Sequence, residues 1–310
     1  MFFVPGGCLR YNSLGIRSVS SNWKESVINE MITWRYIKSG PMDPAWNMAI
    51  DEAIMNAVSE GGAPPTLRFY GWQPATLSIG YFQKAEDEVD FASVTERGIG
   101  FVRRPTGGRA VLHDQELTYS MILPETYPDM PKSVTESYRI LSNGLLHGFR
   151  RLGLQADMVT LADEGEKAKF ASAGSAACFD SPSWYELVVE DRKVAGSAQM
   201  RQRGVVLQHG SILLDMDVDL LFELLYYPNE RLRQRLKQSF VQKAVAINDI
   251  KRSLGQPPVT LSETEEAFER GIPEGLGIKL ERGVLTPSEQ AEAERLVKEK
   301  YGNREWNMKR

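Results

Sequence analysis

The segment CFDSPSWYELVVEDRKVAGSAQ, from Cys178 to Gln199, holds two strand-like runs on either side of a polar turn. The runs are Ser183–Glu190 and Val194–Ala198, and a third run, Gly204–Leu214, follows the turn residues RQR. Because such short turns bring consecutive strands side by side, this part of the chain predicts antiparallel pairing within a β-sheet.

Further strands are expected on the N-terminal side of this segment. Apolar runs bounded by turn residues predict strands over Ile32–Lys38, Thr66–Tyr70, Thr76–Gly80 and Phe101–Arg103, and a strand pair formed by Ala110–His113 and Glu116–Leu123. Residues 158–177 have the small and polar composition of a loop. A loop of this length inside a compact domain is usually functional or mobile.

Helices are expected on both sides of the strand-rich region. Asp43 followed by Pro44 is a helix start, and Ser133 with Glu136 fits a capping box. Apolar spacing extends the first helix to Ser59 and the second to Leu152. Further helices are predicted over Phe91–Arg97, Val218–Tyr226, Glu230–Gln238, Ser262–Arg270 (started by Ser262 and Glu265) and Pro287–Tyr301 (started by Thr286 and Glu289). Strands without strict β–α alternation favour an α+β fold, with a central mixed or antiparallel sheet flanked by helices.

Composition narrows the class of protein. The chain has 310 residues, a net charge of −4 and two cysteines. The charge argues against a nucleic-acid partner, two cysteines indicate a reducing compartment and hence the cytoplasm, and no apolar run reaches the length of a membrane span. Residues 1–30 lack a clear period, so we expect a flexible extension or a start codon upstream of the true one. Little weight therefore rests on Cys8.

The segment RRPTGGRAVLHD, residues 103–114, suits contact with a ligand. Gly107 and Gly108 allow a close approach of the backbone, and the neighbouring arginines supply positive charge. The spacing matches neither a P-loop nor a dinucleotide fingerprint. A hairpin turn with solvated arginines is the competing interpretation. His113 and His209 give only a weak metal signal, and a structural role suits each of them better.

Cys178 follows a run of small residues and precedes Lys193 by fifteen positions. A thiol becomes a good nucleophile at neutral pH when nearby positive charge lowers its pKa. A turn at Glu190–Arg192 would fold the chain back and carry Lys193 toward the start of the preceding strand. The competing interpretation is a small buried cysteine and a solvated turn lysine.

RRPTGGRAVLHD and DRKVAGSAQ together resemble the paired signatures of the lipoate–protein ligase, octanoyltransferase and biotin ligase superfamily. The segments RFYGWQPATLSIGYFQ, CFDSPSWYELVV and QHGSILLD fit as well. The resemblance extends from Ile32 to the C-terminus. It implies a ligase-like catalytic domain over residues 31–250, with a helical segment, residues 251–310, packed on the same domain. The motif CFDSPSWYE is similar to that of octanoyltransferases that use a cysteine thioester.

The resemblance implies an acyltransferase of lipoate biosynthesis and protein lipoylation. Octanoate would move from octanoyl-acyl carrier protein to a lysine of the glycine-cleavage H protein or another lipoyl domain. Cys178 would be the nucleophile, and Lys193 would lower the pKa of its thiol and contact the acyl carbonyl. No cofactor and no metal are implied. The remaining residues implied in substrate binding are Arg104, Thr106, Gly107, Gly108, Arg109, His113, Gly196 and Ser197.

Three alternatives stay open. An ATP-dependent lipoate ligase would activate the acid as an adenylate and leave Cys178 incidental. An amidotransferase would move octanoate between lipoyl domains. A non-catalytic binding protein would bind without turnover. Within the first interpretation, the charges of Arg104 and Arg109 are expected to attract an acidic carrier protein.

Overall fold

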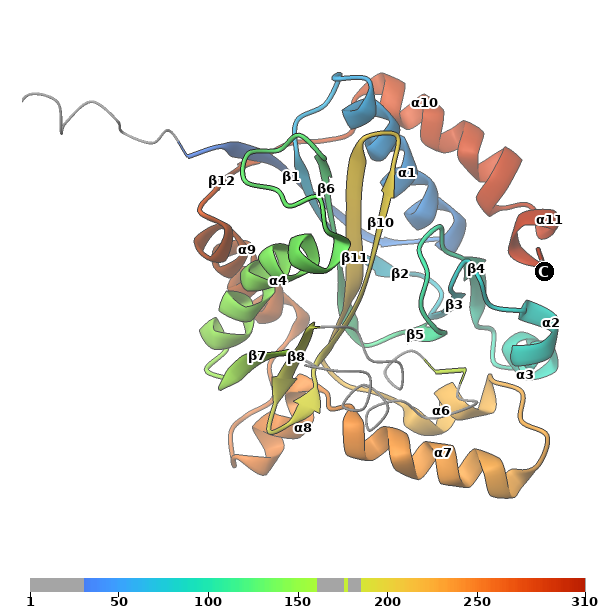
Figure 1. Cartoon of the computed structure of the whole chain (residues 1–310). Coiled ribbons are helices and arrows are strands. Elements are labelled where there is room, and N and C mark those ends of the chain that lie inside the picture. The colour runs from blue at the N-terminus through green and yellow to red at the C-terminus, as the bar shows by residue number, and fades with distance from the viewer. Residues whose placement is uncertain (1–30, 161–175, 178–184, 310) are drawn as a thin grey trace, which may run out of the picture. The chain divides into compact units, whose positions relative to one another are not determined.

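A six-stranded mixed sheet organises the chain in the computed structural model, which describes residues 31–160, 176–177 and 185–309 (Figure 1). The first four strands in the sheet order pair antiparallel and the last two are added in parallel. This arrangement confirms the α+β class with a mixed sheet. In sheet order the strands are β10 (Ala195–Gln202), β11 (Val205–Leu213), β6 (Glu116–Pro124), β2 (Thr66–Trp72), β1 (Thr33–Met42) and β12 (Lys279–Arg282).

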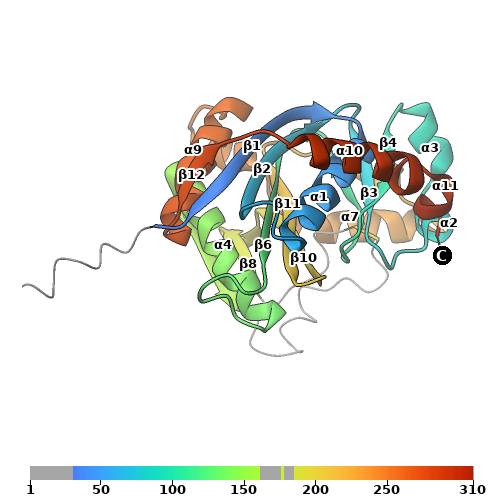
Figure 2. The same cartoon turned by 90° about the horizontal axis from the view of Figure 1, so that it is seen from above.

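Helices cover both faces of this sheet, which explains why β6 is buried along nearly its whole length. On one face, α4 (Val134–Arg151) and α9 (Leu261–Leu276) pack against β-strand residues such as Tyr119. On the other face, α1 (Pro44–Ser59) and α10 (Pro287–Leu296) pack against residues such as Ile122 (Figure 2). Because successive side chains of β6 point to opposite faces of the sheet, they belong to two separate hydrophobic clusters.

Two three-stranded sheets flank the large one. The first has the order β4 (Gly100–Arg103), β3 (Thr76–Ile79) and β5 (Val111–His113); the second has the order β7 (Ala156–Thr160), β8 (Tyr185–Val189) and β9 (Arg192–Lys193). The expected pairing of Ala110–His113 with Glu116–Leu123 is wrong. β6 is already bonded to β2 and β11 on its two edges, so β5 pairs with β3 instead.

Most helix starts lie where the sequence places them. Asp43 caps α1 by accepting from the Ala45 amide at 2.9 Å, and Thr286 with Glu289 forms the capping box of α10. The start expected for α9 at Ser262 is wrong, because the capping box is Thr260 with Glu263. The other helices are α2 (Ala85–Glu88), α3 (Phe91–Glu96), α6 (Val218–Glu223), α7 (Glu230–Lys243), α8 (Ile247–Ser253), the π-helix η2 (Val297–Tyr301) and α11 (Arg304–Asn307).

Two sequence expectations concern residues near or outside the described ranges. The loop expected at 158–177 begins too early, because Met158–Thr160 belongs to β7, which pairs with β8. Cys8 and the rest of residues 1–30 lie outside the described residues. The described residues from Ile32 onward form one compact unit. Among the described residues, no helix combines the length and the apolar character that crossing a membrane requires.

Close contact between α4 and α9 depends on glycine and gives a stability prediction. A Cβ added at Gly271 would lie 2.4 Å from the backbone nitrogen of Gly148, which cannot move without shifting the helix. We expect Gly271→Ala to lower the free energy of unfolding by about 1–3 kcal/mol, the usual cost of overpacking. Gly62→Ala is the control, because its Cβ would meet nothing closer than 3.5 Å. Equal urea midpoints for the two variants would contradict the prediction.

Candidate active site

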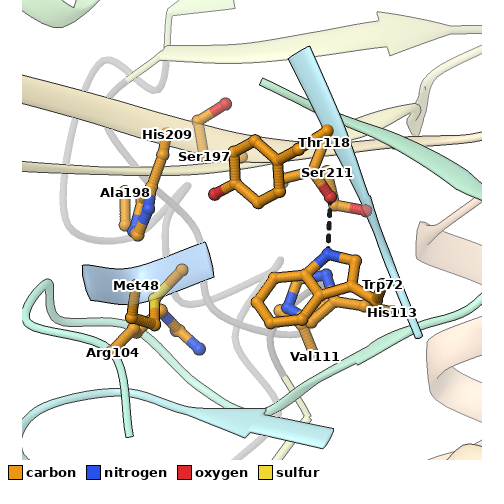
Figure 3. A pocket seen from close by; sticks show the side chains of 13 residues that line it. Met48, Trp72, Arg104, Val111, His113, Thr118, Ser197, Ala198, His209 and Ser211 are labelled. Atoms are coloured by element: carbon orange, nitrogen blue, oxygen red, sulfur yellow. Dashed lines mark hydrogen bonds between the residues drawn. The ribbon is translucent and has the colours of Figure 1, made fainter. Parts of the chain in front are cut away.

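A cavity opens between the large sheet and the small sheet that contains β5 (Figure 3). Side chains from α1, β2, β5, β6, β10 and β11 line it, together with Arg104 after β4. The apolar part of the lining suits an aliphatic chain. The lining consists of Met48, Tyr70, Trp72, Arg104, Val111, His113, Thr118, Gly196, Ser197, Ala198, His209, Gly210 and Ser211.

One wall is built on the buried pair of His113 and Glu116. His113 Nδ1 lies 2.7 Å from Glu116 Oε1, and its other ring nitrogen lies 2.8 Å from the hydroxyl of Ser78. The imidazole also stacks on Trp72, with ring centroids 4.2 Å apart. Thr118 and Ser211 donate their hydroxyl hydrogens to the two oxygens of Glu116. These contacts fix the orientation of the His113 ring.

The opposite wall contains a second histidine–carboxylate pair. His209 Nδ1 lies 3.5 Å from Asp51 Oδ2, and Nε2 lies 2.6 Å from the hydroxyl of Thr106. Burial lowers the pKa of His209 below its usual value, although Asp51 acts in the opposite direction. His209 is therefore neutral near pH 7. Nδ1 then donates to the carboxylate and Nε2 accepts from the threonine hydroxyl.

Asp51 is the centre of a larger buried network behind this wall. It accepts from the guanidinium of Arg68 at 2.8 Å, from Ser120 at 2.9 Å and from the phenol of Tyr70 at 3.0 Å. Burial would raise the pKa of Asp51, but the charge of Arg68 and the contact with His209 hold it below its usual value. The carboxylate is therefore charged and paired inside the protein.

The glycine turn at residues 105–109 connects the two walls. Arg104 is buried, and its guanidinium donates to the carbonyl oxygens of Gly107 at 3.0 Å and Arg109 at 2.6 Å. It also donates to the Ser78 hydroxyl at 3.0 Å, which links the turn to His113. Gly108 has φ +95°, a conformation that favours glycine. Buried arginine contradicts the interpretation of this segment as a turn with solvated arginines.

The arginines of this segment therefore differ in what they can contact. Arg103 is fully buried and donates to the carbonyls of Gly80, Tyr81 and Gln83. The burial of Arg104 does not fit its expected role of attracting a carrier protein from solution. Arg109 remains 40% exposed and lies 3.4 Å from Glu88, so for this residue that role stays a prediction.

Gly196 and Ser197 lie on β10, at the edge of the large sheet, and line the cavity. The Ser197 hydroxyl accepts from the phenol of Tyr119 at 2.7 Å. A Cβ at the neighbouring Gly210 would lie 2.4 Å from the carbonyl oxygen of Gly196, so the two backbones approach as closely as glycine allows. Gly196 and Gly210 thus present backbone to the cavity, beside the hydroxyl of Ser197.

Lys193 lies at the end of the tight β8–β9 hairpin. Glu190 and Asp191 form its turn with φ values of 52° and 59°. The sequence predicted that the chain after this turn would run back along the preceding strand, and this is wrong. Only two residues of β9 pair with β8, with Lys193 opposite Val188. The chain then continues into β10 of the large sheet. The ammonium of Lys193 is buried and lies 2.9 Å from a carboxylate oxygen of Glu186. This contradicts the interpretation of Lys193 as a solvated turn lysine.

Cys178 lies outside the described residues, but the two residues before it are described. Ala176 accepts through its carbonyl from the Ala110 amide at 2.9 Å, and Ala177 forms a parallel bridge with Ala110. Val111, which follows Ala110 in the chain, lines the cavity. Of the predicted site residues that the structure describes, Arg104, His113, Gly196 and Ser197 line one cavity. Thr106 contacts the lining residue His209, while Gly107, Gly108, Arg109 and Lys193 are not part of the lining.

Sequence reasoning missed Asp51, Arg68 and Glu116. Asp51 interrupts the apolar face of a predicted helix, and Glu116 opens a strand that is otherwise apolar. A charged residue at an inward-facing position is a usable signal, because such a residue must find a partner. The partners themselves come from distant strands. Among the described residues, no group of histidine, cysteine and acidic side chains could hold a metal ion.

The Glu116 network gives a prediction on stability and on the shape of the cavity. Glu116→Ala would remove the acceptor for His113, Thr118 and Ser211. We expect a loss of about 2–4 kcal/mol in the free energy of unfolding, because these buried groups would be left unpaired. Glu116→Gln keeps an acceptor oxygen and should lose less. Thermal and urea unfolding of both variants measure this, and an alanine variant as stable as the glutamine one would contradict it.

The sequence of this chain is similar to those of known proteins. The family model of the lipoyl protein ligase A/B catalytic domain matches residues 43–272. The chain is 62% identical over 280 residues to an octanoyltransferase LipM of Brevibacillus brevis, covering 90% of this chain and 100% of the relative. It is 55% identical over 278 residues to the corresponding protein of Bacillus subtilis, covering 90% and 99%.

Solved structures agree on the fold. A bipartite lipoate protein ligase of Thermoplasma acidophilum, solved in work on that ligase and its E2 lipoyl domain, superposes with a TM-score of 0.73. It is 27% identical, and the match covers 89% of this chain and 96% of the other. A lipoate-protein ligase A bound with ATP gives a TM-score of 0.69 at 28% identity, covering 89% and 99%.

Proposed function

Because this chain belongs to the lipoyl protein ligase A/B catalytic-domain family, we propose that it forms an octanoyl thioester on Cys178 during turnover. The chain is an octanoyltransferase and acts in lipoate biosynthesis. The proposed donor is octanoyl-acyl carrier protein, and the proposed acceptor is a lysine of the glycine-cleavage H protein. The thioester, the donor and the acceptor are the parts that experiments must test.

The proposed reaction has two steps. In the first, the Cys178 thiolate attacks the carbonyl carbon of the donor thioester, a new carbon–sulfur bond forms, and the carrier thiol leaves as a thiolate that takes up a proton. In the second, a neutral lysine amine attacks the same carbon. The carbon–nitrogen bond forms, the bond to Cys178 breaks, and the amine loses a proton. Exchange of thioesters is nearly balanced, while the amide is more stable and makes the second step favourable.

One observation carries the proposal best: Ala177, the chain neighbour of Cys178, pairs with Ala110, next to the cavity residue Val111. This pairing supports a thiol close to a cavity whose lining is mainly apolar, as contact with an octanoyl chain requires. Arg104 donates to the carbonyl oxygens of Gly107 and Arg109 and so fixes the backbone of the glycine turn. This supports a catalytic role for the backbone amides of the turn. Amides fixed in this way can stabilise the oxyanion of each step.

The proposed roles of the other residues follow from their positions. Thr106 and His113 are held by buried networks on the two cavity walls, and Gly196 and Ser197 supply the third side. Lys193 is proposed to keep the thiol of Cys178 ionised and to contact the acyl carbonyl. High identity to octanoyltransferases over nine tenths of the chain favours this function over an ATP-dependent ligase or an amidotransferase.

Mass spectrometry of the intact protein tests the proposal. We expect an octanoyl adduct on the wild type after incubation with octanoyl-acyl carrier protein without ATP. The adduct should be removed by hydroxylamine and absent from Cys178→Ala. If no adduct forms, and a lipoyl domain is modified only with ATP and free octanoate, then the chain works as a ligase and the thioester proposal is wrong.

A further inference from the structure

The helix α7 carries much more positive charge than the rest of the chain. Its residues Glu230–Lys243 include five basic side chains and one acidic side chain, whereas the whole chain has a net charge of −4. The basic residues are Arg231, Arg233, Arg235, Lys237 and Lys243. Such a concentration on one surface helix steers partners of opposite charge.

The inner face of α7 packs beside the segment that leads to Cys178. Leu236 and Phe240 belong to the same buried hydrophobic cluster as Ala110, Ala176 and Ala177. The chain that follows α7 lies beside Lys193, since the Val245 amide donates to the Lys193 carbonyl at 2.9 Å. The helix therefore lies close to the proposed active site (Figure 1).

The outer face of α7 presents two arginines to solvent. Arg231 and Arg235 are exposed and lie four residues apart, on the same side of the helix. Neither forms a hydrogen bond or an ion pair within the described part of the chain. Arg233 and Lys237, in contrast, are paired with Glu230 and Asp219. Arg231 and Arg235 thus keep their charge available to a partner.

We propose that the exposed face of α7 docks the acidic carrier protein that delivers the octanoyl thioester. This inference rests on the proposed donor and thioester. Carboxylates on the carrier would lie against Arg231 and Arg235, next to the segment before Cys178. Complementary charge increases the rate of encounter and fixes the orientation of the carrier. The buried Arg104 cannot supply this contact, whereas α7 presents it at the surface.

The test compares two donors on the double variant Arg231→Glu/Arg235→Glu. With octanoyl-acyl carrier protein at low salt, we expect KM to rise about three- to tenfold, with the difference shrinking as salt is added. With octanoyl-N-acetylcysteamine, an uncharged small donor, the rate of acylation should equal that of the wild type. This second measurement shows that the variant is folded and active.

Lys279→Glu/Lys298→Glu is the matched control, because it makes the same change in net charge at exposed sites on β12 and η2, away from α7 (Figure 1). It should leave the KM for the carrier protein unchanged. An unchanged KM in the α7 variant, an equal rise in the control, or a rise in the KM for the H protein instead would overturn the docking proposal. Failure of the wild type to form an adduct with either donor would instead overturn the proposed thioester.

Discussion

Replacing Asp51 by alanine is expected to lower the free energy of unfolding by about 3–5 kcal/mol, the usual cost of removing one partner of a buried ion pair. Arg68 is fully buried, and in the variant its guanidinium would keep only neutral partners, Asn47 and Ser39. Tyr70 and Ser120 would lose the same acceptor. Urea unfolding followed by circular dichroism measures the loss.

Two further variants make this prediction specific. Glu266→Ala removes an exposed carboxylate that is paired with Arg270, and it should cost no more than about 0.5 kcal/mol. The double variant Asp51→Leu/Arg68→Met removes both buried charges and should lose less stability than the sum of the single losses. If Asp51→Ala were as mild as Glu266→Ala, the buried charge of Arg68 would not depend on Asp51.

The same carboxylate gives the sign of a pH effect. The pKa of Asp51 in the folded state lies below its usual value, which is about 3.9 in an unfolded chain. Its stabilisation is therefore complete above that value and is lost as the pH falls through the folded-state pKa. The pKa of the neutral His209 is also lowered, so protonation of the unfolded chain below about pH 6.5 adds a loss in the same direction. Acid unfolding of Asp51→Ala should lack the first of these losses.

The sequence predicted the elements better than their partners. Capping residues such as Asp43 and Thr286 act within one helical turn, so a short window of sequence is enough to find them. The separation of β5 from β6 depends instead on β2 and β11, which occupy both edges of β6. The parallel strand β12 was missed because it is short, polar and mostly exposed. Its pairing with β1 spans almost the whole chain.

The same division applies to the candidate site. Residues within the two motifs, such as His113 and Ser197, were predicted because the resemblance covers contiguous segments. Glu116 and Asp51, which hold the cavity walls, lie outside the named site residues and act across strands. Their role depends on which side chains meet in space, and periodicity along one element does not contain that information.

Lys193→Met is expected to slow acylation of Cys178 by about a hundredfold near neutral pH. A nearby ammonium lowers the pKa of a thiol, and its loss shifts the pKa by about one to three units, which reduces the thiolate fraction by the corresponding factor. The loss of acylation rate should diminish at higher pH, where the thiol is ionised in the variant as well. The pH dependence of iodoacetamide alkylation at Cys178 measures the thiol pKa directly.

Glu186 makes the prediction sharper, because its carboxylate lies 2.9 Å from the same ammonium and offsets part of its charge. Glu186→Gln should therefore lower the thiol pKa, the opposite of Lys193→Met, while Lys193→Met/Glu186→Gln avoids leaving an unpaired buried carboxylate. Lys251→Met is the control for burial alone, since Lys251 is a buried lysine that donates to the Leu152 carbonyl at 2.5 Å. It should reduce stability without moving the alkylation profile. If Lys193→Met also left that profile unchanged, Lys193 would be a structural partner of Glu186, and the activation of Cys178 would need another source.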